Sequence, residues 1–150
     1  MLRIASALAV IAVGATAVTA VYAQNLDIIK ARKESMKAVG GAAKEPGAMM
    51  KGDAKFELAK VQAALKVYQA ESAKQKDMYP DNSKTGGDTT VLPAIWEKKA
   101  DFTGRYDKLI ADAKAAEGAI KDEASFKTEW PKVMSNCGGC HKEYRVPPKQ

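Results

Sequence analysis

Five consecutive residues near the C-terminal end carry the strongest chemical signal in the sequence, Cys137-Gly138-Gly139-Cys140-His141. This spacing is the attachment motif of c-type haem. On a helix the two cysteines are three residues apart and the histidine follows Cys137 by four, so the three side chains share one face. The thiols can then form thioether bonds to the two vinyl groups of one haem, while the imidazole ligates the iron. The motif predicts one covalently bound haem c with His141 as an axial ligand.

Two cysteines and one histidine also allow other chemistry. A redox pair of Cys137 and Cys140 would make the chain a thiol–disulfide oxidoreductase, but that chemistry favours a βαβ context that the sequence lacks. A zinc site needs about four ligands, and the sequence supplies two cysteines and a single histidine. A chance occurrence of the motif would leave a haem-free helical binding protein.

An uncharged stretch rich in Ala, Val, Ile and Leu follows Arg3 and ends in a small-x-small sequence at Ala23. These features indicate a signal peptide over residues 1–23. We expect cleavage before Gln24, export to the periplasm and no stable membrane insertion of the mature chain, with Ala20 as an alternative cut point. A retained membrane anchor is the other interpretation, because the stretch is nearly long enough to span a bilayer.

Apolar residues recur at helical spacing in four segments, and no strand-like alternation is present. Steps of three and four residues place each set on one face of a helix. The pattern predicts an all-α protein, an antiparallel four-helix bundle over residues 24–150 with the haem near the C-terminal helix. The four sets are Ile29, Arg32, Met36, Val39 and Ala43; Leu58, Val61, Leu65 and Tyr68; Ile95, Phe102, Tyr106, Leu109, Ala113, Ala116 and Ile120; and Phe126, Trp130, Val133, Cys137, Cys140 and Tyr144.

Turn-forming residues separate these segments. Glu45-Pro46-Gly47 interrupts the chain after the first, and Gly- and Pro-containing sequence over 79–88 precedes the third. Asp53 and Ser125 have the side chains that cap helix N-termini, so we expect them to cap the second and fourth helices.

The composition excludes several classes of protein. With 150 residues, 46% hydrophobic and 28% charged, the chain is neither collagen-like, mucin-like nor fully disordered. Aromatic residues make up 7%, which argues against an all-β fold. The net charge of +6 is spread along the chain, so no nucleic-acid partner is expected. Because its one histidine is assigned to the iron, the chain offers no Ser-His-Asp arrangement, and we predict that it is not an enzyme.

The chain resembles the class II c-type cytochromes, the cytochrome c′ family, from Gln24 to about Arg145. Most class I c-type cytochromes carry the haem motif near the N-terminus, whereas here it lies near the C-terminus of four helical segments. The resemblance implies the four-helix bundle and one haem c. Its further matches are Ile28-Ile29-Lys30-Ala31-Arg32 followed by Met36, Ile95-Trp96 through Phe102, and Tyr144-Arg145 after the motif.

The second axial position of the iron is open to a methionine, a lysine or no ligand. Of the methionines, Met36 alone lies in mid-helix on an apolar stripe. The resemblance implies that this position faces the haem. Most family members have five-coordinate, high-spin iron there, and in a low-spin branch a methionine of the first helix completes the coordination. We expect Met36 to be the sixth ligand, and the alternative is a packing methionine beside an open site.

Arg32 lies one helical turn before Met36 on the same stripe. A charge on a buried face is costly unless it is paired, and a haem propionate would suit a bidentate arginine. The resemblance also places an arginine of this helix near a propionate. The alternative is a side chain that reaches out to solvent. Six aromatic residues either wall the haem or fill the core: Trp96, Phe102, Tyr106, Phe126, Trp130 and Tyr144.

The sequence therefore predicts an exported monohaem c-type cytochrome that transfers single electrons between periplasmic redox proteins. The alternative within the same fold is a high-spin cytochrome c′ whose open site binds small gases such as nitric oxide. Lysines such as Lys98, Lys99 and Lys142 more often form a solvated face than a docking site, although they favour encounter with acidic redox partners. A homodimer through the first two helices is also consistent with the resemblance.

Overall fold

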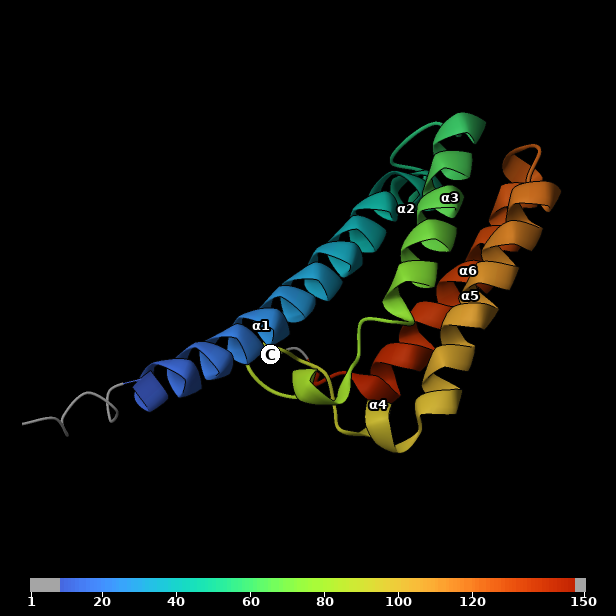
Figure 1. The fold of residues 1–150 in the computed structure, drawn as a ribbon. Coiled ribbons are helices and arrows are strands. Elements are labelled where there is room, and N and C mark those ends of the chain that lie inside the picture. Colours follow the sequence, from blue (N-terminus) through green and yellow to red (C-terminus); the bar gives the residue numbers. More distant parts are fainter. Residues whose placement is uncertain (1–8, 148–150) are drawn as a thin grey trace, which may run out of the picture.

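Four long helices form a bundle in the computed structural model, which describes the backbone of residues 9–147 and the side chains of residues 26–147 (Figure 1). They are α1 (Ala9–Ala42), α3 (Leu58–Gln75), α5 (Lys99–Ala119) and α6 (Glu123–Tyr144), joined by the shorter α2 (Lys44–Lys51), η1 (Asp81–Ser83) and α4 (Ala94–Glu97). Helix α3 packs against both α1 and α5, and α5 packs against α6. The predicted all-α four-helix bundle is confirmed.

The predicted signal peptide, residues 1–23, lies outside the residues whose side chains are described, and it stays a prediction. Among the described residues, no helix combines the length and the apolar character needed to cross a membrane.

The predicted apolar stripes face inwards and form two core clusters. One lies around Leu65, Phe126 and Trp130, between α3, α5 and α6. The other contains Tyr79, Ile95, Phe102, Tyr106 and Tyr144 and is called the aromatic cluster below. Burial of such side chains contributes about 25 cal/mol per Å² of apolar surface, so these stripes hold the helices in register around the site.

The connection between α1 and α3 differs from the prediction. The sequence predicts a break in the helix at Glu45-Pro46-Gly47, but the structure has the short helix α2 there. The helix can form because Pro46 stands in its first turn, where a proline is tolerated. Gly52 then ends α2 with a φ of 82°. The chain becomes helical again only at Leu58, and Glu57 is the residue at the N-cap position. The prediction that Asp53 caps this helix is therefore wrong.

Helix α6 begins with a capping box. The Asp122 carboxylate accepts a hydrogen bond from the Ser125 N–H at 2.8 Å, and the Ser125 Oγ accepts one from the Asp122 N–H at 3.1 Å. Asp122 is the N-cap and Ser125 is the third helical residue. The prediction that Ser125 is the N-cap is wrong by three positions, although Ser125 does take part in the cap.

Residues 86–92, called the strap below, pack against α1 at one end and form hydrogen bonds with the end of α6 at the other. The Leu92 N–H donates to the Tyr144 carbonyl at 3.0 Å, and the Val146 N–H donates to the Thr90 carbonyl at 2.8 Å. At Gly87 the φ is 53°, and an added Cβ would lie 3.1 Å from the Ile29 side chain. A glycine is needed there because the strap approaches α1 so closely.

Candidate cofactor site

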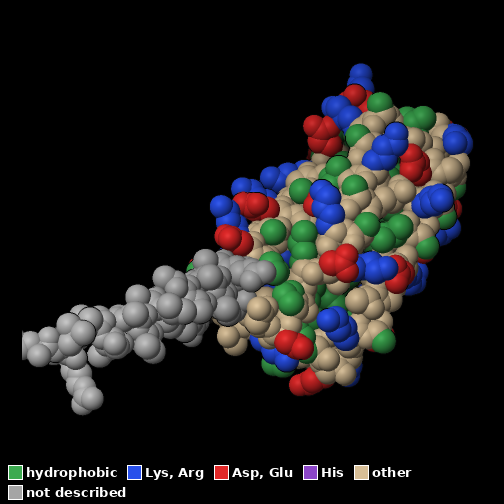
Figure 2. All heavy atoms as spheres, viewed as in Figure 1, with side chains coloured by type: hydrophobic (Ala, Val, Ile, Leu, Met, Phe, Trp, Pro, Cys, Tyr) green, Lys and Arg blue, Asp and Glu red, His purple; other side chains and the backbone are tan. Residues whose placement is uncertain are grey.

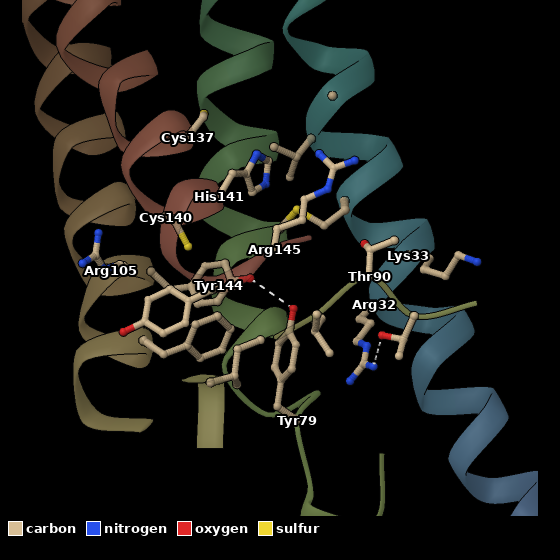
Figure 3. Close-up of a pocket in the computed structure, with 18 of the residues that line it drawn as sticks. Arg32, Lys33, Tyr79, Thr90, Arg105, Cys137, Cys140, His141, Tyr144 and Arg145 are labelled. Carbon is tan, nitrogen blue, oxygen red and sulfur yellow. Dashed lines mark hydrogen bonds between the residues drawn. The ribbon is translucent and has the colours of Figure 1, made fainter. Parts of the chain in front are cut away.

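A cavity of about 590 Å³ lies between α1, α5, α6 and the strap. Its volume is in the range of cofactor and ligand pockets. Cys137, Cys140 and His141 line it from α6, and Arg32 and Met36 line it from α1. Figure 3 shows His141 pointing from α6 toward α1. The structure thus brings all five predicted site residues to one cavity.

The motif residues have the state that haem attachment requires. Cys137 and Cys140 are free, partly buried thiols. Burial raises the pKa of both thiols, so neither is the activated thiolate of a redox enzyme. Desolvation and the Arg145 guanidinium lower the pKa of His141, which keeps the imidazole neutral and able to ligate a metal at neutral pH. In the described part of the chain, no group of three His, Cys, Asp or Glu side chains could hold a metal ion such as zinc.

Arg32 is a buried cation on the cavity wall, with 2% of its surface exposed. Its guanidinium donates to the Ser83 Oγ at 3.2 Å, the Ser83 carbonyl at 3.0 Å and the Thr89 Oγ1 at 2.6 Å. All these acceptors are neutral, and no carboxylate of the described residues forms an ion pair with this side chain. The alternative, a side chain that reaches out to solvent, is therefore wrong. A buried charge without a counter-charge is costly. An anion bound in the cavity that Arg32 lines would remove this cost.

The aromatic cluster forms one wall of the cavity. The ring of Phe102 makes edge-to-face contacts with Tyr79, Tyr106 and Tyr144 at centroid distances of 4.7, 5.2 and 5.1 Å. The Tyr144 hydroxyl donates to Asp101 at 2.5 Å, and burial together with this carboxylate raises the pKa of Tyr144 to about 12. Of the six aromatic residues singled out from the sequence, the cavity is lined by Phe102, Tyr106 and Tyr144, the other core holds Phe126 and Trp130, and Trp96 packs at the edge of the aromatic cluster.

A charged network fixes the turn of α6 that carries His141. Arg105 donates to Glu143 at 2.7 Å and to Asp101 at 2.8 Å, and its guanidinium lies 5.3 Å from the centre of the Tyr144 ring. Lys98 reaches the same Glu143 at 2.8 Å. On the face shown in Figure 2, basic side chains are interspersed with acidic ones, as expected for a solvated surface.

Met36 is the only methionine among the residues that line the cavity. Met49 is buried in the other core, and Met134 accepts a hydrogen bond from the Tyr68 hydroxyl at 3.6 Å. Met78 packs against the aromatic cluster without lining the cavity. The structure therefore places Met36 where a distal residue is expected, and its ligation of iron stays a prediction.

Comparison with known proteins identifies the family. The family model described as Cytochrome C' matches residues 27–145. The chain belongs to the cytochrome c′ family. Cytochrome c′ of Rhodopseudomonas palustris is 48% identical over 120 residues, which are 80% of this chain and 82% of that relative. Cytochrome c-556 of Agrobacterium fabrum is 33% identical over 119 residues, 79% of this chain and 80% of that relative.

Solved structures agree with this assignment. The structure of cytochrome c′ from Rhodopseudomonas palustris has a TM-score of 0.81 and 46% identity, over 82% of this chain and 98% of that chain. A structural model of oxidised cytochrome c556 from the same organism has a TM-score of 0.76 and 26% identity, over 82% of this chain and 98% of that chain.

Members of the cytochrome c′ family are non-enzymatic proteins with one covalently attached haem c, so this chain is a haem protein and not an enzyme. Its cavity fits that group, because it offers two thiols, a neutral imidazole and a buried cation that lacks an anion. Both cysteine sulfurs would be bonded to the haem in thioether linkages, so Cys137 and Cys140 could not form a redox disulfide. The thiol–disulfide oxidoreductase alternative is therefore rejected.

The sequence did not reveal several residues that shape the site, namely Gln75, Tyr79, Thr89 and Arg105. Their partners lie between 4 and 57 positions away along the chain, and no local motif marks them. Gln75 and Tyr79 are four residues apart, a spacing that would place both on one face of a helix. This signal misleads, because α3 ends at Gln75 and Tyr79 lies in the loop beyond it.

Proposed function

We propose that the protein is a high-spin cytochrome c′ that leaves one face of its haem open for a small gas such as nitric oxide. The observation that carries the proposal is the 48% identity to a protein named cytochrome c′, against 33% to a cytochrome c-556 over a similar share of the chain. The family also favours a periplasmic location, as does the signal peptide indicated by the sequence.

Each site residue has a role in this proposal. The thiols of Cys137 and Cys140 would fix the haem against α6, and His141 would ligate its iron. Arg32 uses three of its five guanidinium donors on Ser83 and Thr89. One of its remaining donors, the Nε–H or the second Nη1–H, would donate to a propionate, which supplies the missing anion.

The α1 wall would accept a neutral gas. Met36 and Val39 are half-buried and present apolar side chains to the cavity. In this arrangement Met36 packs against the aromatic cluster instead of binding iron. The bound haem supplies an iron centre that small diatomic molecules bind, and the residues of α1 set how much room they find.

A one-electron carrier is the second candidate function. Its specific support is that Met36 lines the cavity, together with the cytochrome c-556 relatives. A thioether ligand from Met36 would raise the reduction potential and block gas binding. The partners would then be periplasmic redox proteins.

The experiment is an optical spectrum of the oxidised and reduced holoprotein, for the wild type, Met36→Leu and the control Met134→Leu, which changes a methionine away from the cavity. We expect a high-spin wild type that binds carbon monoxide when reduced, and no change of spin state in either variant. A low-spin wild type with a sulfur-to-iron charge-transfer band, lost only in Met36→Leu, would replace the gas-binding function with electron transfer.

A further inference from the structure

Gln75 is a buried polar residue that the haem chemistry described above does not use. It is the last residue of α3 and has no exposed surface. Its Nε2 donates to the Arg32 carbonyl at 2.8 Å, and its Oε1 accepts from the Tyr79 hydroxyl at 2.8 Å and from the Tyr106 hydroxyl at 3.4 Å. One side-chain amide thus joins α1, α3, α5 and the loop after α3. Because a buried amide is costly without partners, this junction is well defined.

The bond to α1 is made at the turn that matters for the cofactor. In an α-helix the carbonyl of Arg32 also accepts from the N–H of Met36, four residues later, and its second lone pair is free for Gln75. Gln75 is therefore hydrogen-bonded to the turn of α1 that begins at Arg32 and ends at Met36.

The bond to Tyr79 positions the same cation from the other side. The Arg32 guanidinium lies 5.0 Å from the centre of the Tyr79 ring. The backbone of Tyr79 is held as well, because its carbonyl accepts the Trp96 indole N–H at 3.1 Å. Figure 3 shows the Tyr79 hydroxyl directed toward the middle of the cavity, and the Tyr106 hydroxyl lies 3.3 Å from it.

We propose that Gln75 is a positioning residue of the haem site: its amide fixes the Arg32 backbone and the Tyr79 ring, and so places the Arg32 charge against the cofactor. Gln75 does not line the cavity itself, so it acts through Arg32. The inference rests on haem occupying this cavity, as in the proposed function, but it holds whether or not Met36 binds iron.

The consequence is electrostatic. Reduction adds an electron to the haem, and a cation held nearby favours the reduced form. If Gln75 loses its hydrogen bonds, the guanidinium is held less closely and the reduction potential falls. A structural role alone would lower the stability of the bundle without shifting the potential in a fixed direction.

The test is a spectroelectrochemical titration of the holoprotein with Gln75→Met, which keeps the length of the side chain and removes its hydrogen bonds. We expect the equilibrium to shift about tenfold toward the oxidised form, or about 59 mV for one electron. The matched control is Gln62→Met, because Gln62 lies on the same helix and its Nε2 donates to the Glu117 carbonyl at 3.1 Å, away from the cavity. The control should keep the wild-type potential, and an equal shift in both variants overturns the proposal.

A double variant separates action through Arg32 from a general effect. In an Arg32→Met background, Gln75→Met should produce no further shift, because the charge that it positions is gone. Two shifts that simply add would overturn the proposal. Tyr79→Phe keeps the test decisive if Gln75→Met does not fold: it removes one hydroxyl, and a smaller shift in the same direction supports the proposal, while an unchanged potential refutes it. The spin state of the wild type, which tests the proposed function, is a separate measurement.

Discussion

The guanidinium of Arg32 lies over the ring of Tyr79, 5.0 Å from its centre, in a cage made otherwise of Ser83 and Thr89. Every partner in this cage is neutral, although the cation is buried. Burial lowers the pKa of Arg32, yet an arginine stays protonated in proteins. The cage therefore leaves a positive charge at the cavity wall without neutralising it, and a carboxylate of the haem would complete the arrangement.

Removal of this charge should destabilise the holoprotein more than the apoprotein. Hydrogen bonds to charged groups contribute about 1.5–3 kcal/mol, so Arg32→Met should lower the free energy of unfolding of the holoprotein by an amount in that range. Without haem the cation is buried and unpaired, and its loss should cost less. Denaturant titrations of both forms measure the difference. Lys30→Met is the control, because Lys30 is an exposed lysine of the same helix that does not line the cavity. Equal losses in holoprotein and apoprotein would argue against a propionate partner.

Covalent attachment should depend on both cysteines of the motif. In the wild type, acid–organic extraction should leave the haem on the polypeptide, and the intact mass should include one haem. The double variant Cys137→Ser and Cys140→Ser should release all pigment, since no thioether bond can form. Each single variant should keep a haem mass through its remaining thioether bond. Free extraction of the pigment from the wild type would contradict the attachment.

Folding should depend on the cofactor. The haem would fill the cavity of about 590 Å³ between α1 and α6, and an unfilled cavity destabilises a core because its walls lose packing contacts. We expect the apoprotein to have a lower melting temperature and less helix than the holoprotein, measured by circular dichroism. Equal melting curves would show that the bundle is stable without its haem.

The helical register and the haem motif could be predicted from the sequence because both follow from short-range spacing. Every residue of the four predicted stripes is buried or half-buried, including Cys137 and Cys140 on α6 and Met36 on α1. Spacing of three and four residues dictates a helix face whatever the rest of the chain does. The sequence alone therefore predicts which helix face carries each candidate ligand.

The strap and the partners of Arg32 could not be predicted in this way. The contacts of Arg32 with Ser83 and Thr89 span more than fifty positions, and they depend on how the loop after α3 folds back over α1. Helix ends were also ambiguous, because Asp53 and Asp122 are both suitable capping residues in the sequence. Only the structure shows that the chain after Gly52 stays non-helical until Leu58.

The Asp122 capping box should make part of the stability dependent on pH. Hydrogen bonds from Ser125 hold the pKa of the Asp122 carboxyl below its ordinary value, which is about 3.9. A carboxylate with a lowered pKa in the folded state contributes stability that is complete above the unfolded pKa and is lost as the pH falls through the folded value. The contribution should thus be constant at neutral pH and disappear in acid.

Asp122→Ala should therefore lower the melting temperature at pH 7, because α6 loses its N-terminal cap. The difference from the wild type should shrink as the pH falls below about 4, where the carboxylate begins to protonate in the unfolded chain. Thermal melts across a pH series measure it. Asp53→Ala is the matched control: Asp53 is exposed and does not cap α3, so this change should leave the melting temperature nearly the same throughout. A difference for Asp122→Ala that persists unchanged at the lowest pH would show that the ionised carboxylate is not what stabilises the start of α6.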